Sequence, residues 1–153
     1  MSPTSPARRA AKKGFTLVEI LIVVIILGIL AAIVIPQFTS ASQNARTNSL
    51  ETQLKTLKTQ VQLFELEHGG VKPKLSSNWD DFTQRTNAAG NVETDGDFGP
   101  YMAVAPSNPL HDGDDKTTIG TDEGGSTAWL WDETTGTIKA RRRNAAGTGW
   151  VYE

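Results

Sequence analysis

The segment KKGFTLVEILIVVIILGILAAIVIPQF, residues 12–38, is the most distinctive part of this chain. It begins with two lysines and a glycine and continues as an apolar run that contains a single carboxylate, Glu19. From Phe15 to Ile35 the run has 21 residues, of which only Thr16 and Glu19 are polar. As an α-helix it would be roughly 30 Å long, about the hydrocarbon thickness of a bilayer. We therefore predict a membrane helix over residues 15–36.

The charges of the chain are divided between a basic head and an acidic body. Arg8, Arg9, Lys12 and Lys13 precede the apolar run, and no acidic residue comes before Glu19. By the positive-inside rule, the head stays in the cytoplasm and the residues after Pro36 lie across the membrane. The whole chain has 15 basic and 17 acidic residues, a balance that argues against a nucleic-acid-binding protein.

The chain contains no cysteine, which excludes disulfides, thiolate metal sites and a cysteine nucleophile.

Glu19 needs an explanation because a carboxylate in a membrane helix costs ~2–3 kcal/mol at mid-bilayer depth, and less near the interface. It could snorkel to the interface as part of a plain anchor. Alternatively, its charge is paired with a cationic group. No residue within one helical turn of Glu19 is basic, apart from those of the basic head. The partner would then be new, such as an amino terminus freed by cleavage before Phe15. A secretory signal peptide cleaved near residues 39–41 is a further alternative, although the run is long for one.

The order of residues around Glu19 resembles the processing and assembly motif of type IV pilins and type II secretion pseudopilins. The resemblance rests on Lys12-Lys13, on Gly14-Phe15-Thr16-Leu17-Val18-Glu19 and on the apolar run that follows. It implies that residues 1–14 are a leader and that a prepilin peptidase cuts after Gly14 and N-methylates Phe15. Glu19 would pair with the Phe15 amine of a neighbouring subunit during assembly.

Gly28, inside the apolar run, and Pro36, directly after it, are residues that weaken a helix. Glycine in a helix interior costs about 1 kcal/mol and proline about 3 kcal/mol relative to alanine. In the family, the helix between residues such as Gly28 and Pro36 can kink or melt inside a filament. For Gly28, simple packing between helices is an equal alternative.

The rest of the chain predicts an α+β fold. Apolar residues at steps of three and four predict an amphipathic helix over residues 37–69, ended by Gly69 and Gly70. These apolar residues are Leu50, Leu54, Leu57, Val61 and Phe64. Residues 70–153 are loop-rich, with a hairpin of residues 127–132 and 137–142 and a possible last strand at 150–152. The expected architecture is one long helix packed on a small C-terminal antiparallel sheet.

The loop-rich half also resembles the G-type major pseudopilins in outline. The resemblance lies in the order of Gly99-Pro100-Tyr101, Pro106 and Asn108-Pro109-Leu110 before the hairpin.

Three consecutive arginines follow in the second strand of the hairpin: Arg141, Arg142 and Arg143. They predict a charged edge strand that prevents pairing with other chains, or a contact with an acidic neighbouring subunit.

An acidic loop is the one candidate metal site. Asp112, Asp114, Asp115 and Asp122 crowd a glycine-rich stretch and could offer oxygen ligands to calcium. Major pseudopilins often hold calcium in this region, but their Asp-Pro-Trp-Gly stretch is replaced here by residues 108–111. Lys116 also breaks the EF-hand spacing. A solvated acidic loop without a metal is the alternative.

These features predict a structural subunit and not an enzyme. The resemblance implies a subunit that is stored in the inner membrane, with its leader in the cytoplasm and its C-terminal domain in the periplasm. There it would polymerise into a type II secretion pseudopilus, together with minor pseudopilins and an inner-membrane assembly platform. The alternatives are a surface type IV pilin for adhesion, motility or DNA uptake, and a secreted calcium-binding module with a signal peptide.

Overall fold

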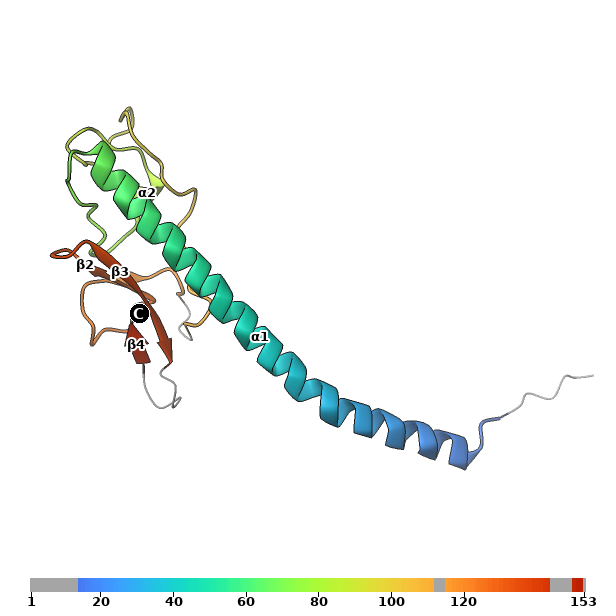
Figure 1. Cartoon of the computed structure of the whole chain (residues 1–153). Coiled ribbons are helices and arrows are strands. Elements are labelled where there is room, and N and C mark those ends of the chain that lie inside the picture. The colour runs from blue at the N-terminus through green and yellow to red at the C-terminus, as the bar shows by residue number, and fades with distance from the viewer. Residues whose placement is uncertain (1–13, 112–114, 144–149, 153) are drawn as a thin grey trace, which may run out of the picture. The chain divides into compact units, whose positions relative to one another are not determined.

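The computed structural model describes residues 14–111, 115–143 and 150–152. Its first element is a 51-residue helix, α1 (Leu17–Glu67), as the apolar run and the amphipathic pattern predict together. Pro36 lies inside α1 and does not end it. The chain divides into two compact units, Met1–Ala41 and Ser42–Glu153, so α1 contributes to both (Figure 1).

In the first unit, the apolar side chains of α1 have no protein to cover them. The large hydrophobic residues from Leu17 to Ile35 keep between 40 and 81% of their surface exposed. Among the described residues, α1 is the one helix that is long and apolar enough to cross a membrane. In water such a surface would be costly, at about 25 cal/mol for each Å² of apolar area.

In the second unit, α1 packs on the sheet through the predicted stripe. Leu50, Leu57, Val61 and Phe64 are buried, and Leu54 is partly buried against the same cluster. The strands supply the other side of this core, with Trp129, Trp131, Ile138 and Ala140. Loops supply Leu75, and the short helix α2 (Asp80–Thr83) supplies Phe82.

Within the described residues, the sheet has four strands in the order β1-β2-β3-β4. Figure 1 labels β2, β3 and β4. They are β1 (Ile119–Gly120), β2 (Trp129–Asp132), β3 (Thr137–Arg143) and β4 (Trp150–Tyr152). The predicted hairpin and last strand are confirmed, since β2, β3 and β4 pair antiparallel. The sheet is nevertheless mixed, because β1 pairs with β2 in parallel. A two-residue strand is too short to leave a periodic signal in the sequence.

The prediction of a charged edge strand at residues 141–143 is wrong. β3 lies between β2 and β4, and Arg141 and Arg142 face Tyr152 and Val151 across the β3–β4 ladder. The arginines therefore do not protect an open edge, because β4 already occupies that edge. Charge in a strand signals an edge only when no further strand returns to pair with it.

Two loop residues that belong to the G-type resemblance, Pro106 and Asn108, hydrogen-bond to residues in or next to the sheet. Asn108 is fully buried, and its Nδ2 donates to the carbonyls of Ala128, at 2.9 Å, and Arg141, at 2.7 Å. The Pro106 carbonyl accepts a 3.0 Å hydrogen bond from Trp129 Nε1. These bonds satisfy buried polar groups that would otherwise carry a desolvation cost of about 1–3 kcal/mol each.

Asp81 gives the second unit a testable pH dependence. Burial raises the pKa of Asp81, and the 2.6 Å hydrogen bond from the Lys74 amide offsets this only in part. A raised folded-state pKa means that the stability from Asp81 is full below the unfolded pKa of about 3.9 and is lost as the pH rises through the folded pKa. We expect Asp81→Asn to gain stability over the parent as the pH rises. Urea unfolding of the detergent-solubilised full-length chain across the acid range measures this, and parallel curves would contradict it.

Candidate assembly site

The predicted cleavage site lies just before α1, in a stretch without regular secondary structure. Gly14, Phe15 and Thr16 precede the first helical residue, Leu17, and all three are exposed. The Phe15 side chain keeps 83% of its surface accessible. A Cβ atom placed on Gly14 would meet no atom within 4 Å. The backbone on both sides of the Gly14–Phe15 bond is therefore accessible.

Glu19 contacts the residue that starts the helix. Its Oε2 accepts hydrogen bonds from the Thr16 amide, at 2.8 Å, and from the Thr16 hydroxyl, at 2.9 Å. The Glu19 amide donates in return to Thr16 Oγ1, at 3.2 Å. The Thr16 carbonyl accepts the bond from Ile20, so Thr16 is the N-cap and Glu19 the third helical residue. This reciprocal pair is a capping box, which satisfies two amides that the first turn of a helix leaves without partners.

The capping box changes the interpretation of Glu19. The sequence offered snorkelling or a new ammonium partner as explanations of Glu19, and neither included a contact with Thr16. Within a single chain, Glu19 also stabilises the start of α1, and its charge lies at the positive end of the helix dipole. The pattern Thr-x-x-Glu before an apolar run is the signal that could have revealed Thr16.

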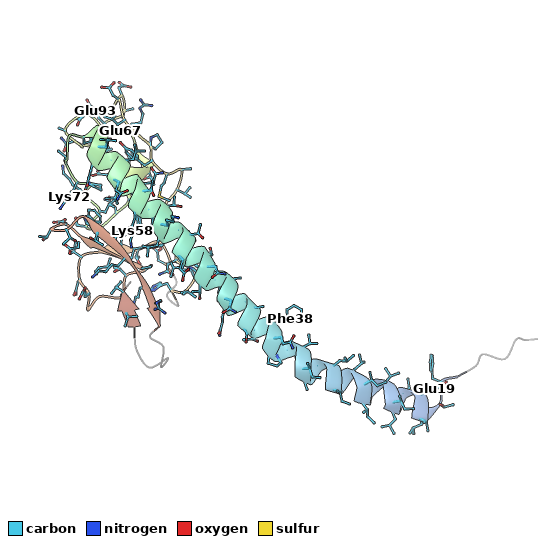
Figure 2. All side chains as sticks on the ribbon, viewed as in Figure 1. Glu19, Phe38, Lys58, Glu67, Lys72 and Glu93 are labelled. Carbon is cyan, nitrogen blue, oxygen red and sulfur yellow. The ribbon has the colours of Figure 1, made fainter. Side chains whose placement is uncertain are left out.

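The capping box leaves part of Glu19 available. Its side-chain hydrogen bonds all involve Oε2, and among the described residues Oε1 has no hydrogen-bond partner. Glu19 is also exposed (labelled at the start of α1 in Figure 2). A carboxylate can accept bonds at both oxygens. The arrangement can therefore hold the helix cap and receive an ammonium group at the same time.

Gly28 and Pro36 both lie inside α1, away from the Glu19 site along the chain. A Cβ atom on Gly28 would meet nothing within 4 Å, so no contact within this chain requires a glycine there. The hydroxyls of Thr39 and Ser40 donate to the carbonyls of Ile35 and Pro36, at 3.2 and 3.1 Å. The predicted kinking or melting at Gly28 and Pro36 stays a prediction about the assembled state.

The proposed calcium ligands are only partly described. Asp112 and Asp114 lie outside the described residues. Asp115 Oδ1 accepts bonds from the Thr117 hydroxyl and amide, which lower the pKa of Asp115, and Asp122 Oδ1 accepts from the Gly124 amide. Among residues 14–111, 115–143 and 150–152, no group of three or more metal-ligating side chains occurs. The calcium site therefore stays a prediction.

Comparison with known proteins identifies the N-terminal segment. Residues 9–35 match the model of the prokaryotic N-terminal methylation motif. The competence protein ComGC of Bacillus subtilis is 43% identical over 65 residues, which are 42% of this chain and 66% of that protein. The type II secretion system core protein G of Pseudomonas aeruginosa is 38% identical over 61 residues, 40% of this chain and 43% of that protein. The fimbrial protein EcpB of Eikenella corrodens is 39% identical over 75 residues, 49% of this chain and 46% of that protein.

The chain thus spans less than two thirds of the length of these relatives. No solved structure matches it significantly. The shared segments nevertheless agree with the geometry, since the methylation motif covers the non-helical Gly14–Thr16 stretch, the capping box and the apolar half of α1. This motif, the relatives and the α+β architecture support the assignment of the chain to the type IV pilin and type II secretion pseudopilin superfamily.

Proposed function

We propose that this chain is the major structural subunit of a type II secretion pseudopilus. It is stored in the inner membrane through residues 15–36 and polymerises through the same segment after its leader is removed. The polymer grows in the periplasm and drives protein export across the outer membrane. The chain acts by assembly and not as an enzyme.

One observation carries this proposal: the exposed apolar half of α1 begins with a capped, charged end. Leu17–Ile35 exposes apolar side chains that only lipid or other subunits can cover. Glu19 offers a carboxylate oxygen at the start of this surface, four residues after Phe15. A new ammonium group at Phe15 of a neighbouring copy would neutralise it, and such a charged hydrogen bond is strong where water is excluded. The pairing sets one subunit in register with the next.

The type II secretion core protein G is the relative that supports a pseudopilus in particular. The loop order of Gly99-Pro100-Tyr101, Pro106 and Asn108 supports the same assignment. The partners would be further copies of this chain, a prepilin peptidase, minor pseudopilins and the inner-membrane assembly platform.

A surface type IV pilus is the second candidate. It is favoured by the similarity to ComGC, over 42% of the chain, and to the fimbrial protein EcpB, over 49% of the chain. Deletion of the gene separates the two candidates. Loss of exoprotein secretion without loss of surface fibres supports the pseudopilus, whereas loss of shearable surface fibres with normal secretion supports the pilus.

The maturation step has a direct test in the mass and amino-terminal peptide of the protein from its own membranes. We expect the chain to begin at Phe15 and to carry one additional methyl group. A matched variant, Gly14→Val, should keep its leader, because a branched side chain would stand beside the scissile bond. An amino terminus near Ser42 would instead indicate a signal peptide and ordinary secretion, and an intact Met1 would indicate a plain anchor.

A further inference from the structure

Asn108 joins the loop that precedes β1 to the sheet. It is fully buried, and its backbone amide donates to the Lys116 carbonyl at 2.9 Å. Its side-chain amide donates to the carbonyls of Ala128, just before β2, and Arg141, in β3. Its Oδ1 accepts from the Leu110 amide at 2.9 Å. One buried residue therefore connects two points of the loop with two neighbouring strands, which lie side by side in Figure 1.

Only an amide side chain can make this set of bonds at position 108. Carbonyl oxygens accept hydrogen bonds and cannot donate them, so the atom that faces Ala128 and Arg141 must be the nitrogen, with its two hydrogens. The Leu110 amide can only donate, so the atom that faces it must be the oxygen. An aspartate would instead place a carboxylate oxygen against two carbonyl oxygens. The bonding partners therefore require asparagine and exclude the acid.

The backbone carbonyls of the same loop already accept hydrogen bonds within the chain. Four consecutive carbonyls do so: those of Asp115, Lys116, Thr117 and Thr118. In that order, the donors are the Thr118 hydroxyl, at 3.2 Å, the Asn108 amide, at 2.9 Å, Trp79 Nε1, at 2.6 Å, and the Trp129 amide, at 2.9 Å. A cation that needs carbonyl ligands would have to compete with all four donors.

The described carboxylates of this region are engaged as well. Asp115 Oδ1 accepts from the amide and the hydroxyl of Thr117, and Asp122 Oδ1 accepts from the amide two residues later. Glu123 forms an ion pair with Lys139, at 3.2 Å. Calcium takes about six to eight oxygen ligands, several of them from carboxylates. The oxygens of the described residues do not fit this requirement, because they already close turns, pair with a lysine or bind protein donors.

We propose that Asn108 fastens the loop to the sheet without a metal ion, in place of the calcium that the resemblance to major pseudopilins implies. Its two amide hydrogens are the positive partners of the Ala128 and Arg141 carbonyls. This fastening belongs to the single folded chain, so it is the same in a pilus and in a pseudopilus. Asp112 and Asp114 lie outside the described residues, and a titration of the whole chain with calcium tests them directly.

Calcium titration of the detergent-solubilised full-length chain is the first test. Extracellular calcium modules have dissociation constants of about 0.1–1 mM, so about 10 mM calcium would lower the unfolding equilibrium constant of such a module by about tenfold to a hundredfold. For this chain we expect urea unfolding to change by less than about twofold, relative to the same concentration of magnesium. A larger decrease with calcium alone overturns the proposal.

Two matched changes from asparagine to aspartate are the second test, in calcium-free buffer. Asn108→Asp should raise the unfolding equilibrium constant at least about a hundredfold, because a buried carboxylate then replaces two hydrogen bonds. Asn91→Asp is the control. Asn91 is exposed, and its Oδ1 accepts from Lys74, a bond that a carboxylate keeps, so we expect a change of less than about twofold.

The two tests overturn the proposal separately. If Asn108→Asp is as stable as Asn91→Asp, the side chain of Asn108 does not fasten the loop and the proposal is wrong. Failure of Asn108→Asp to fold is the extreme form of the expected loss, and the calcium titration of the parent chain still decides whether a metal shares the role. The filament function stands or falls independently of both results, because neither experiment measures assembly.

Discussion

Replacing Glu19 with alanine is expected to leave leader cleavage intact and to lower filament formation by at least about tenfold. In the filament, the Phe15 ammonium of a neighbouring copy would be buried without its carboxylate, and breaking one side of a buried ion pair costs about 3–5 kcal/mol. The substitution also removes the half of the capping box in which Glu19 Oε2 accepts from Thr16, whereas the amide of residue 19 can still donate to Thr16 Oγ1. Filament yield by shearing and electron microscopy, together with the intact mass, measures both parts of this prediction.

Two matched variants separate the charge of Glu19 from its capping role. Glu19→Gln keeps an oxygen that can accept from the Thr16 amide but removes the charge. Thr16→Val keeps the charge and removes the hydroxyl that bonds to Glu19 in both directions. We expect Glu19→Gln to assemble as poorly as Glu19→Ala, and Thr16→Val to assemble much better than either. If Glu19→Gln assembles like the parent, the ion pair is not required, and the helix cap alone accounts for the role of Glu19.

Gly96→Ala is expected to destabilise the second unit by about 3 kcal/mol, at the upper end of what overpacking costs. A Cβ atom on Gly96 would lie 2.4 Å from the carbonyl oxygen of Thr86 and 2.5 Å from its carbonyl carbon. These are backbone atoms, so no side-chain rotation can relieve the clash. Thr86 is fully buried and pairs with Phe98 in both directions, at 3.0 and 3.1 Å.

The damage from Gly96→Ala should extend to the end of α1. Thr86 Oγ1 lies 3.0 Å from Nε2 of the buried His68, whose ring stacks on Phe64. Displacing Thr86 therefore disturbs a buried polar contact as well as the loop. Urea unfolding of the full-length chain in detergent measures the loss. Gly124→Ala is the control, because its nearest neighbours are side-chain atoms of the exposed Asp122, and surface changes of this kind usually stay within about 0.5 kcal/mol. Equal effects of the two substitutions would contradict the proposed clash.

The tertiary contacts of the loops between residues 70 and 126 could not be predicted from the sequence. Their glycines, prolines and asparagines predict turns but do not say which turn meets which strand. Asn108 joins Ala128 to Arg141, and Gly96 lies against Thr86, only because the fold brings distant segments together. The parallel β1 and the central position of β3 were missed for the same reason. Pairing partners are a property of the folded chain and leave no local pattern.

The parts of this protein that follow from local periodicity could be predicted from the sequence alone. The length of the apolar run predicted the membrane half of α1, and the steps of three and four predicted its buried stripe, because helical geometry converts spacing directly into a face. The contact of Glu19 with Thr16 also follows a local spacing, Thr-x-x-Glu, that could have been recognised in the sequence. Which other face of α1 stays uncovered and how the arginines of β3 are placed could be seen only in the folded chain. Those features depend on which surfaces the sheet, the loops and the start of the helix already occupy, and a spacing rule does not contain that information.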